Sequence, residues 1–371
     1  MYGNVVPGTQ IPIVTIVTQR LLLQAVKNAY AEGRRLIVPL VGFPGLSLTG
    51  STIKLAQQNY REHFTVLNAI AETFKPDAIF PLMDLSVEAN ALGRLTLFPK
   101  RESATVVKDE FTSDELEATR RIDISSDTRL LGYVETQKLM SAGLPSTVIR
   151  GGYITGPYTL AALLMGADEA ALATISDPDR LSAVCELASK KIRDYVQLLT
   201  KAGAQLICIL EPSAVMLGPE QFAEFSVRYV LPIIERCAQA GVIAVYHICG
   251  NSMHLVDKMS ESGVDALSLD SPEAGVDLPA VAERISSEVV LIGNISPTGS
   301  LLNGLPSDVE NDVFRLLKSM DAYPNFVLST GCDLPQDVPL ANIDAFMRAG
   351  RRYKIMRNEQ VGMEQKAQTT N

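Results

Sequence analysis

The sequence predicts an α/β protein, a single (β/α)₈ TIM barrel with a helical segment inserted between its second and third strands. Two observations favour this fold class. Eight short apolar runs recur along the chain, each ending in a polar or small residue, and segments of helical periodicity separate them. No Gly-x-Gly-x-x-Gly segment follows the first run, which weakens the alternative of an open dinucleotide-binding sheet.

The eight predicted strands are rich in valine, isoleucine and leucine, as expected for parallel strands that are covered on both faces. The helix before the fourth strand has a start signal at Asp177 and Pro178 and a stop signal at Gly203. Alternating strands and helices imply right-handed crossovers and one parallel sheet. The predicted strands are residues 35–42, 78–84, 146–152, 204–211, 242–248, 265–270, 289–295 and 326–331.

We expect one domain, because no internal repeat or linker divides the chain. Residues 1–357 are predicted to form the barrel, and the polar residues 358–371 are predicted to be a disordered tail. The inserted segment is expected at roughly residues 90–145. Charged side chains dominate part of it, so we expect it to cover the barrel mouth or an interface.

Composition excludes several classes of protein. The formal net charge of −9, without a basic stripe, argues against a nucleic-acid-binding protein. The apolar residues 11–18 are too few to span a membrane, and no basic residue precedes Arg20 as a signal peptide would require. We therefore expect a cytoplasmic protein. Its five cysteines are too few for a secreted disulfide scaffold, so they are predicted to be buried apolar residues or metal ligands.

Polar side chains gather at the ends of the predicted strands. In a (β/α)₈ barrel the active site lies at the carboxyl ends of the strands, so these side chains should meet at one mouth. Hydrogen bonding to neighbouring loops is the alternative for any one of them, and for Asp84 or Asp270 alone it is about equally supported. The seven residues are Asp84, Glu211, His247, Cys249, Asp270, Asn294 and Cys332.

Three of these residues have the pattern of a catalytic zinc site. His247 and Cys249 are two positions apart at the end of the fifth predicted strand, so both side chains should point to one face. Cys332 follows the eighth strand, three positions around the barrel, and could reach the same axis. One histidine and two cysteines leave a tetrahedral position open, which is typical of catalytic rather than structural zinc.

The remaining cysteines and histidines are predicted to have structural roles. Cys208 lies inside an apolar strand, and Cys185 and Cys237 lie within helices, so all three are expected to be core residues. His254 is expected to be a helix residue, and His63 is expected to be solvated on a polar helix.

Seven motifs of the chain are distinctive: PLMDLSVEANALG (81–93), GPYTLAALLMG (156–166), EPSAVMLGPEQFAEF (211–225), YHICGN (246–251), GNISP (293–297), STGCDLP (329–335) and PLAN (339–342). With these motifs the chain resembles the uroporphyrinogen decarboxylase superfamily, over about residues 20–353. The set of one histidine and two cysteines is similar to that of its zinc-dependent corrinoid methyltransferase branch, typified by methylcobamide:coenzyme M methyltransferases. This resemblance implies zinc held by His247, Cys249 and Cys332.

The chain also departs from the superfamily pattern, which often has aspartate in place of Glu211 and Ser296. Glu211 precedes His247 by one strand, so we consider it as a catalytic residue that could fill the fourth zinc position before substrate arrives. The alternative is a carboxylate that only forms hydrogen bonds beside the metal site. Asp84, Asp270 and Asn294 are expected to bind substrate.

The resemblance implies methyl transfer between a corrinoid protein and a thiol such as coenzyme M. No histidine stands in a D-x-H-x-x-G segment of the kind that anchors a corrinoid, so the corrinoid should arrive on a separate protein at the barrel mouth. The reverse role, in which zinc activates an O- or N-methyl donor, stays open. Further alternatives are a metal-free uroporphyrinogen decarboxylase, whose arginine-rich amino-terminal loop has no counterpart here, and a non-catalytic corrinoid- or metal-binding protein.

Overall fold

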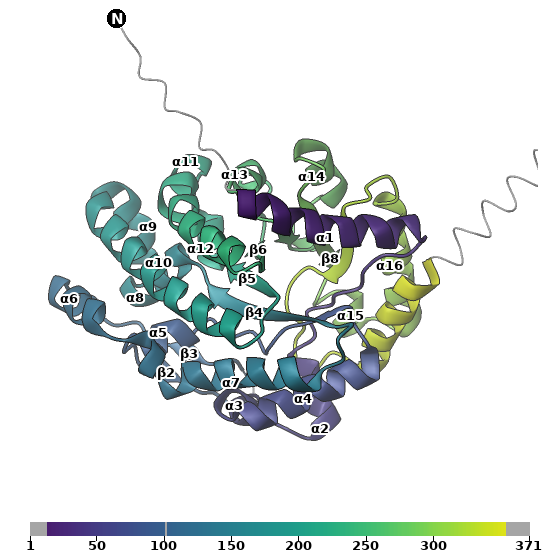
Figure 1. Cartoon of the computed structure of the whole chain (residues 1–371), viewed down its shortest axis with the longest axis horizontal. Helices are drawn as coiled ribbons and strands as arrows, with labels where there is room; N and C mark the ends of the chain where they lie inside the picture. Colours follow the sequence, from purple (N-terminus) through teal and green to yellow (C-terminus); the bar gives the residue numbers. More distant parts are fainter. Residues whose placement is uncertain (1–12, 101, 354–371) are drawn as a thin grey trace, which may run out of the picture.

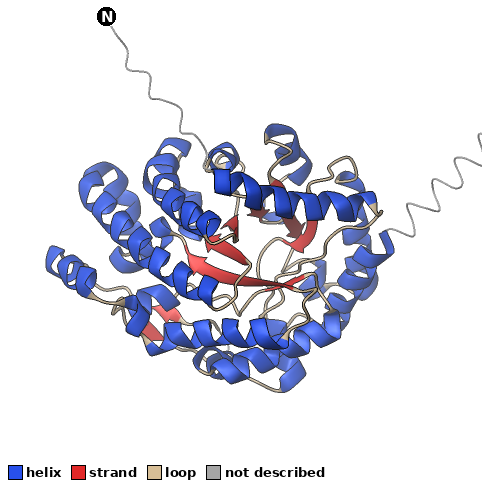
Figure 2. Cartoon of the chain, viewed as in Figure 1, coloured by secondary structure: helices blue, strands red, loops and turns tan. Residues whose placement is uncertain are grey.

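The computed structural model describes residues 13–100 and 102–353, so the predicted tail at 358–371 lies outside the described residues. Seven parallel strands form one curled sheet in the order β1-β4-β5-β6-β7-β8-β9, and helices surround it (Figure 2). The predicted barrel class is confirmed. The strands are β1 (Ala78–Ile79), β4 (Ile149–Thr155), β5 (Leu206–Leu210), β6 (Ile243–Ile248), β7 (Ala266–Leu269), β8 (Val290–Ile295) and β9 (Phe326–Thr330).

The first predicted strand, residues 35–42, closes the ring without forming a regular strand. Ile37 makes an isolated parallel bridge to Leu328 of β9, and its carbonyl accepts a hydrogen bond from the backbone nitrogen of Asp77, just before β1 (3.0 Å). Pro39 interrupts the segment, and proline has no backbone N–H to continue a ladder. The prediction of a full strand was wrong there, although the segment lies between β9 and β1 as an eighth strand would.

The helices lie outside this ring and supply its outer layer (Figure 1). The α-helices are α1 (Ile13–Ala31), α2 (Leu46–Thr49), α3 (Ile53–Gln58), α4 (Tyr60–Phe74), α5 (Val87–Ala91), α6 (Ser113–Arg121), α7 (Thr128–Gly143), α8 (Pro157–Met165), α9 (Ala167–Ser176), α10 (Pro178–Lys201), α11 (Pro219–Phe222), α12 (Arg228–Gln239), α13 (Val256–Glu261), α14 (Leu278–Arg284), α15 (Ser300–Asn303) and α16 (Pro306–Ser319). Residues 340–353 are also helical. The shorter turns are η1 (Phe43–Gly45), η2 (Ile124–Ser126), η3 (Pro212–Met216), η4 (Ala223–Val227) and η5 (Pro272–Ala274).

Helix α10 begins and ends where the sequence signals predict. The side chain of Asp177 accepts a hydrogen bond from the backbone nitrogen of Arg180, and Pro178 occupies the first helical position. Gly203 follows the helix with φ +100°, a conformation that favours glycine. Apolar side chains at helical spacing bury one face of α10, which fixes it against the barrel.

Helix α1 lies across the amino-terminal end of the barrel and contacts the side chains of its interior. Leu22 and Val26 belong to the same buried cluster as Leu206, Val245 and Val290, which lie near the starts of β5, β6 and β8. Figure 1 shows α1 running across the sheet beside β6 and β8. Because α1 covers this end, the carboxyl ends of the strands form the end of the barrel that is available to a substrate.

The inserted segment is shorter than predicted and is not only helical. It contains α5, the antiparallel pair β2 (Thr96–Leu97) and β3 (Thr105–Val106), and α6. Helix α7 falls within the predicted stretch, but it packs beside α4 as a helix of the outer ring. Within the described residues no single helix is long and apolar enough to cross a membrane; α8 and α9 pass the same test only together, across a bend of 107°.

Candidate metal centre

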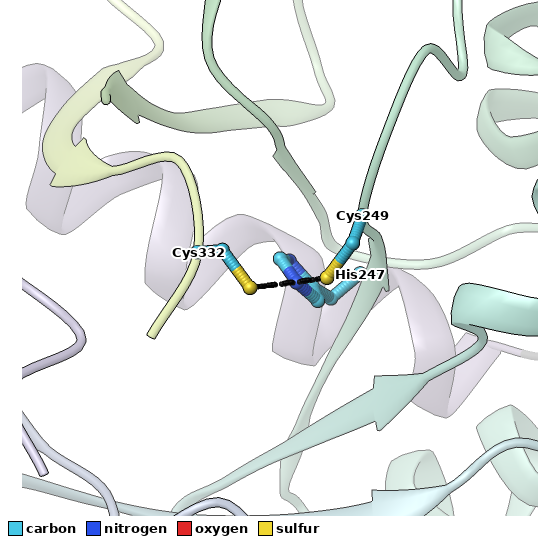
Figure 3. A group of neighbouring side chains, drawn as sticks. All are labelled: His247, Cys249 and Cys332. Carbon is cyan, nitrogen blue, oxygen red and sulfur yellow. Dashed lines mark hydrogen bonds between the residues drawn. The ribbon is translucent and has the colours of Figure 1, made fainter. Parts of the chain in front are cut away.

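His247, Cys249 and Cys332 come together at the carboxyl-terminal end of the barrel. His247 is the last residue but one of β6, Cys249 follows that strand directly, and Cys332 stands two residues after β9. Figure 3 shows the two sulfur atoms and the imidazole ring turned toward one another from opposite sides. The strand order places β9 three positions from β6, as the sequence predicted.

The three donor atoms lie at ligand spacing. His247 Nε2 is 3.0 Å from Cys249 Sγ and 3.8 Å from Cys332 Sγ, and the two sulfur atoms are 3.0 Å apart. Among residues 13–100 and 102–353, this is the one group of three or more histidine, cysteine or acidic side chains that meets the spacing of a metal site. Two widely separated parts of the chain therefore build one compact donor set.

Burial and hydrogen bonding orient the imidazole. His247 is fully buried, and its Nδ1 atom is 3.0 Å from Ser268 Oγ on the neighbouring strand β7. This contact occupies Nδ1, so Nε2 faces the cysteines. Both cysteines are partly exposed, which leaves the side of the cluster that faces the mouth accessible. Ser268 was not predicted, although the alternation of side chains along β7 could have indicated it.

The two thiols differ in acidity. The hydrogen bond from Cys249, aided by His247, holds the pKa of Cys332 well below its ordinary value. The same hydrogen bond, together with burial, raises the pKa of the Cys249 thiol. Cys332 is therefore the more acidic of the two thiols, and a bound cation would favour ionisation of both.

The donor set fits zinc. In a tetrahedral site with Zn–S near 2.3 Å and Zn–N near 2.0–2.1 Å, neighbouring donors lie about 3.5–3.8 Å apart. The observed separations of 3.0–3.8 Å match this spacing after small side-chain rotations. Soft thiolates with one imidazole favour zinc over magnesium or calcium, which prefer oxygen ligands.

Glu211 does not join this donor set. Its carboxylate accepts hydrogen bonds from the backbone nitrogens of Tyr158 (3.0 Å) and Thr159 (2.7 Å), in the first turn of α8, and from Ser226 Oγ (2.8 Å). Burial raises the pKa of Glu211, while these donors oppose that shift. Gly156 is needed beside it, because a Cβ atom there would lie 2.2 Å from Glu211 Cδ. This arrangement matches the alternative of a hydrogen-bonding carboxylate.

Asp270 and Asn294 support the loop that carries Cys249. Asp270 Oδ2 accepts a hydrogen bond from the backbone nitrogen of Gly250 (2.7 Å), the residue after Cys249. Asn294 Nδ2 in turn donates to the carbonyl of Asp270 (2.8 Å). Gly331 allows the loop after β9 to lie close to the loop after β7, since a Cβ atom at Gly331 would lie 2.6 Å from the backbone nitrogen of Ser271. The expected role of Asp270 and Asn294 in substrate binding stays a prediction.

Asp84 is buried and already saturated with donors. It accepts hydrogen bonds from Ser86 N (3.0 Å), Ser86 Oγ (2.6 Å) and the Tyr133 hydroxyl (2.9 Å), and it forms an ion pair with Arg129. Neither Arg129 nor Tyr133 was singled out from the sequence. Asp84 therefore has no oxygen left over for a substrate in this arrangement, and direct substrate binding by Asp84 stays a prediction.

The other histidines and cysteines largely follow expectation. Cys185, Cys208 and Cys237 are buried in apolar clusters, which confirms their predicted packing role. His63 was expected to be solvated, but it is 1% exposed and its Nε2 accepts a hydrogen bond from the backbone nitrogen of Leu82 (2.8 Å). That prediction was wrong, because His63 lies on the inward face of α4.

The family model for uroporphyrinogen decarboxylase (URO-D) matches residues 48–353. The chain belongs to the uroporphyrinogen decarboxylase family. This agrees with the resemblance carried by the sequence motifs, all of which fall within the matched range.

Similar proteins within the family include methyltransferases and decarboxylases. A methylated-thiol–coenzyme M methyltransferase of Methanosarcina mazei is 27% identical over 297 residues, covering 77% of this chain and 75% of that protein. The methylcobamide:CoM methyltransferase MtbA of the same organism is 24% identical over 283 residues, covering 75% of this chain and 80% of its own length. A uroporphyrinogen decarboxylase of Prochlorococcus marinus is 23% identical over 290 residues, with coverages of 75% and 80%.

Solved structures share the fold. A methyltransferase from Methanosarcina mazei superposes with a TM-score of 0.78 at 22% identity, covering 91% of this chain and 98% of its own. A B12-independent methionine synthase from Shewanella superposes with a TM-score of 0.55 at 14% identity, covering 81% and 89%. At these identities the likeness establishes the barrel fold.

Proposed function

We propose that this chain is a zinc-dependent methyltransferase that moves a methyl group between a corrinoid protein and a thiol such as coenzyme M. The observation that carries the proposal is the donor set of His247, Cys249 and Cys332, which is compact, soft and accessible from the mouth. The curated relatives include enzymes named as methyltransferases that act on coenzyme M, which supports the same reaction class.

The residues of the chain would hold and orient the reacting groups. His247, Cys249 and Cys332 would bind the metal, with Ser268 fixing the imidazole and Asp270 fixing the loop after Cys249. Zinc bound there would lower the pKa of a coordinated thiol and so supply a nucleophile at neutral pH. Because both cysteines are partly exposed, a small thiol from the mouth could reach a metal held there and complete its ligand set.

The corrinoid would reach this mouth on a separate protein. The three histidines of the chain lack the D-x-H-x-x-G context that anchors a corrinoid. Helix α1 covers the opposite end of the barrel, so the carboxyl-terminal mouth is the side from which a partner can present a methyl group. Docking at this mouth is therefore part of the proposal.

Three rival functions differ in their use of the cluster. Uroporphyrinogen decarboxylases are represented among the curated relatives, but a metal-free decarboxylase reaction would give the two mouth cysteines no role. Activation of an O- or N-methyl donor would use the same metal ligands with the opposite direction of transfer. A non-catalytic metal- or corrinoid-binding protein would hold zinc without turnover.

Metal analysis and turnover of paired cysteine variants test the proposal. The purified protein should contain about one zinc per chain, and Cys332→Ala should lose both zinc and activity while remaining folded. Cys208→Ala is the matched control, because Cys208 is a buried cysteine of β5 packed in the barrel interior. We expect it to keep zinc and to lose only modest stability.

The turnover assay follows methyl transfer from methylcobalamin to candidate thiols by the visible absorbance of the corrinoid. Metal-free protein with full stability would favour the decarboxylase. Bound zinc without methylation of any thiol would leave donor activation or a non-catalytic role, and assays with methylated donors and Co(I) corrinoid separate these two. Zinc loss in Cys208→Ala would show that the ligands are assigned wrongly.

A further inference from the structure

A pocket of about 380 Å³ lies between helices α3, α4, α5 and α7, and none of the three proposed metal ligands lines it. Figure 1 shows α3, α4 and α7 side by side along one edge of the molecule. A volume of this size accommodates a small molecule. The polar residues around it include Gln57, Gln58, His63, Asn90 and Arg129.

Arg129 is the charged residue of this pocket, and its donors are only partly used. Its side chain is 8% exposed. Its Nη2 atom donates to Asp84 and to Ser86 Oγ, and the Phe98 ring lies 4.8 Å from the guanidinium carbon. The Nε and Nη1 atoms are buried and have no hydrogen-bond partner among the described residues. Three of the five N–H groups of this guanidinium therefore lack an acceptor.

The neighbouring carboxylate cannot satisfy these donors. Both oxygens of Asp84 already accept hydrogen bonds, from Ser86, Tyr133 and the Nη2 atom of Arg129. Buried N–H groups of a charged side chain almost always have an acceptor in native proteins. An acceptor supplied by a ligand in the pocket would satisfy the unpartnered N–H groups of Arg129.

A second side chain of the lining also favours an acceptor, whereas the two helix ends at the pocket are already capped. Helices α4 and α7 begin at Tyr60 and Thr128, which line the pocket. The side chains of Asn59 and Asp127 accept hydrogen bonds from backbone amides of these two ends. Burial lowers the pKa of His63 to about 3, so its ring is neutral. Because its Nε2 accepts from Leu82, its proton resides on Nδ1, which adds a donor beside the pocket.

We propose that this pocket binds a small oxyanion, a carboxylate or a sulfonate, through the unpartnered donors of Arg129. Asp84 offsets one positive charge there, so a monoanion fits the site better than a polyphosphate. The oxyanion is either a free anion or the acidic end of the thiol substrate. The second source rests on the proposed function, whereas the binding site itself does not.

Gly132 offers a way to close the pocket without touching Arg129. It lies on α7 and lines the pocket, and a Cβ atom there would meet no heavy atom within 4 Å. Gly132→Leu should therefore fill the pocket, and leucine is favoured over glycine in a helix. Ala142→Leu is the matched control, because Ala142 is exposed in the last turn of the same helix and does not line the pocket.

Calorimetric titration of the full-length protein with acetate and with methanesulfonate measures binding directly. We expect one saturable site in the parent and in Ala142→Leu, with affinity at least tenfold weaker in Gly132→Leu. Either of two results would overturn the proposal: no saturable binding of both probes to the parent, or equal affinities in the parent and Gly132→Leu.

Comparison of an acidic and a neutral thiol then identifies the source of the anion. If the site holds the substrate, Gly132→Leu should raise KM for 3-mercaptopropionate at least tenfold and leave KM for 2-mercaptoethanol unchanged. If neither KM changes while probe binding is lost, the site binds a free anion. If no thiol is methylated at all, the proposed function fails, and the calorimetric result still decides the anion site.

Discussion

Ser268→Ala tests whether the partner of His247 sets the affinity of the metal centre. Ser268 Oγ is 3.0 Å from His247 Nδ1, and both residues are almost completely buried. Removal of such a partner from a metal-binding histidine typically lowers metal affinity about 10- to 100-fold, or about 1.4–2.7 kcal/mol. The lost hydrogen bond should also lower the free energy of unfolding by about 1 kcal/mol.

Competition with a chromophoric chelator measures the zinc affinity, and urea denaturation measures the free energy of unfolding. Ser189→Ala is a suitable control, because Ser189 Oγ is buried and donates to the backbone carbonyl of Tyr229 (2.7 Å), away from the cluster. We expect it to lose stability but not zinc affinity. Equal zinc affinities in the parent and Ser268→Ala would refute the argument that Ser268 orients the imidazole.

Two further predictions concern buried carboxylates. Burial raises the pKa of Asp265 to about 7, so the stabilisation from its protonated form is complete below about pH 4 and is lost as pH rises through about 7. As pH rises from 5 to 8, the free energy of unfolding of Asp265→Asn should therefore increase by about 3 kcal/mol relative to that of the parent, as measured by urea denaturation. A difference between the two proteins that does not change with pH would contradict this. Gly156→Ala would place a Cβ atom 2.2 Å from Glu211 Cδ and should destabilise the fold by about 1–3 kcal/mol in thermal unfolding while zinc content is unchanged. Loss of zinc from folded Gly156→Ala would restore Glu211 as a ligand.

The strands and helices of the barrel were largely predictable because their signals are local. The start of α10 at Asp177 and Pro178 and its end before Gly203 depend on capping and on the conformational freedom of glycine, which neighbouring residues decide. Residues 35–42 show the limit of this approach. They have the composition of a strand, but Pro39 lacks a backbone N–H and the N–H of Ile37 donates to the Asp77 side chain, so the segment forms a single bridge.

The candidate metal ligands could be predicted because alternation along a strand and position at a strand end decide where their side chains point. Residues that act through hydrogen bonds across the fold could not. Arg129 contacts Asp84 from a helix 45 positions later in the chain. Glu211 accepts hydrogen bonds from the first turn of α8, which lies more than fifty residues earlier in the chain. Pairings of this kind depend on how the helices dock, and local periodicity carries no information about them.

The sequence by itself determined the fold class and the three soft donors His247, Cys249 and Cys332. Periodicity and residue chemistry can be recognised from residues that are close together in the chain. Only the tertiary structure decided which polar groups are already satisfied. In the structure the carboxylate of Glu211 accepts hydrogen bonds from α8, and that of Asp84 interacts with Ser86, Tyr133 and Arg129. A hydrogen bond needs its partners within about 3 Å. Whether a buried side chain is free for a ligand therefore depends on contacts between segments that are distant in the sequence.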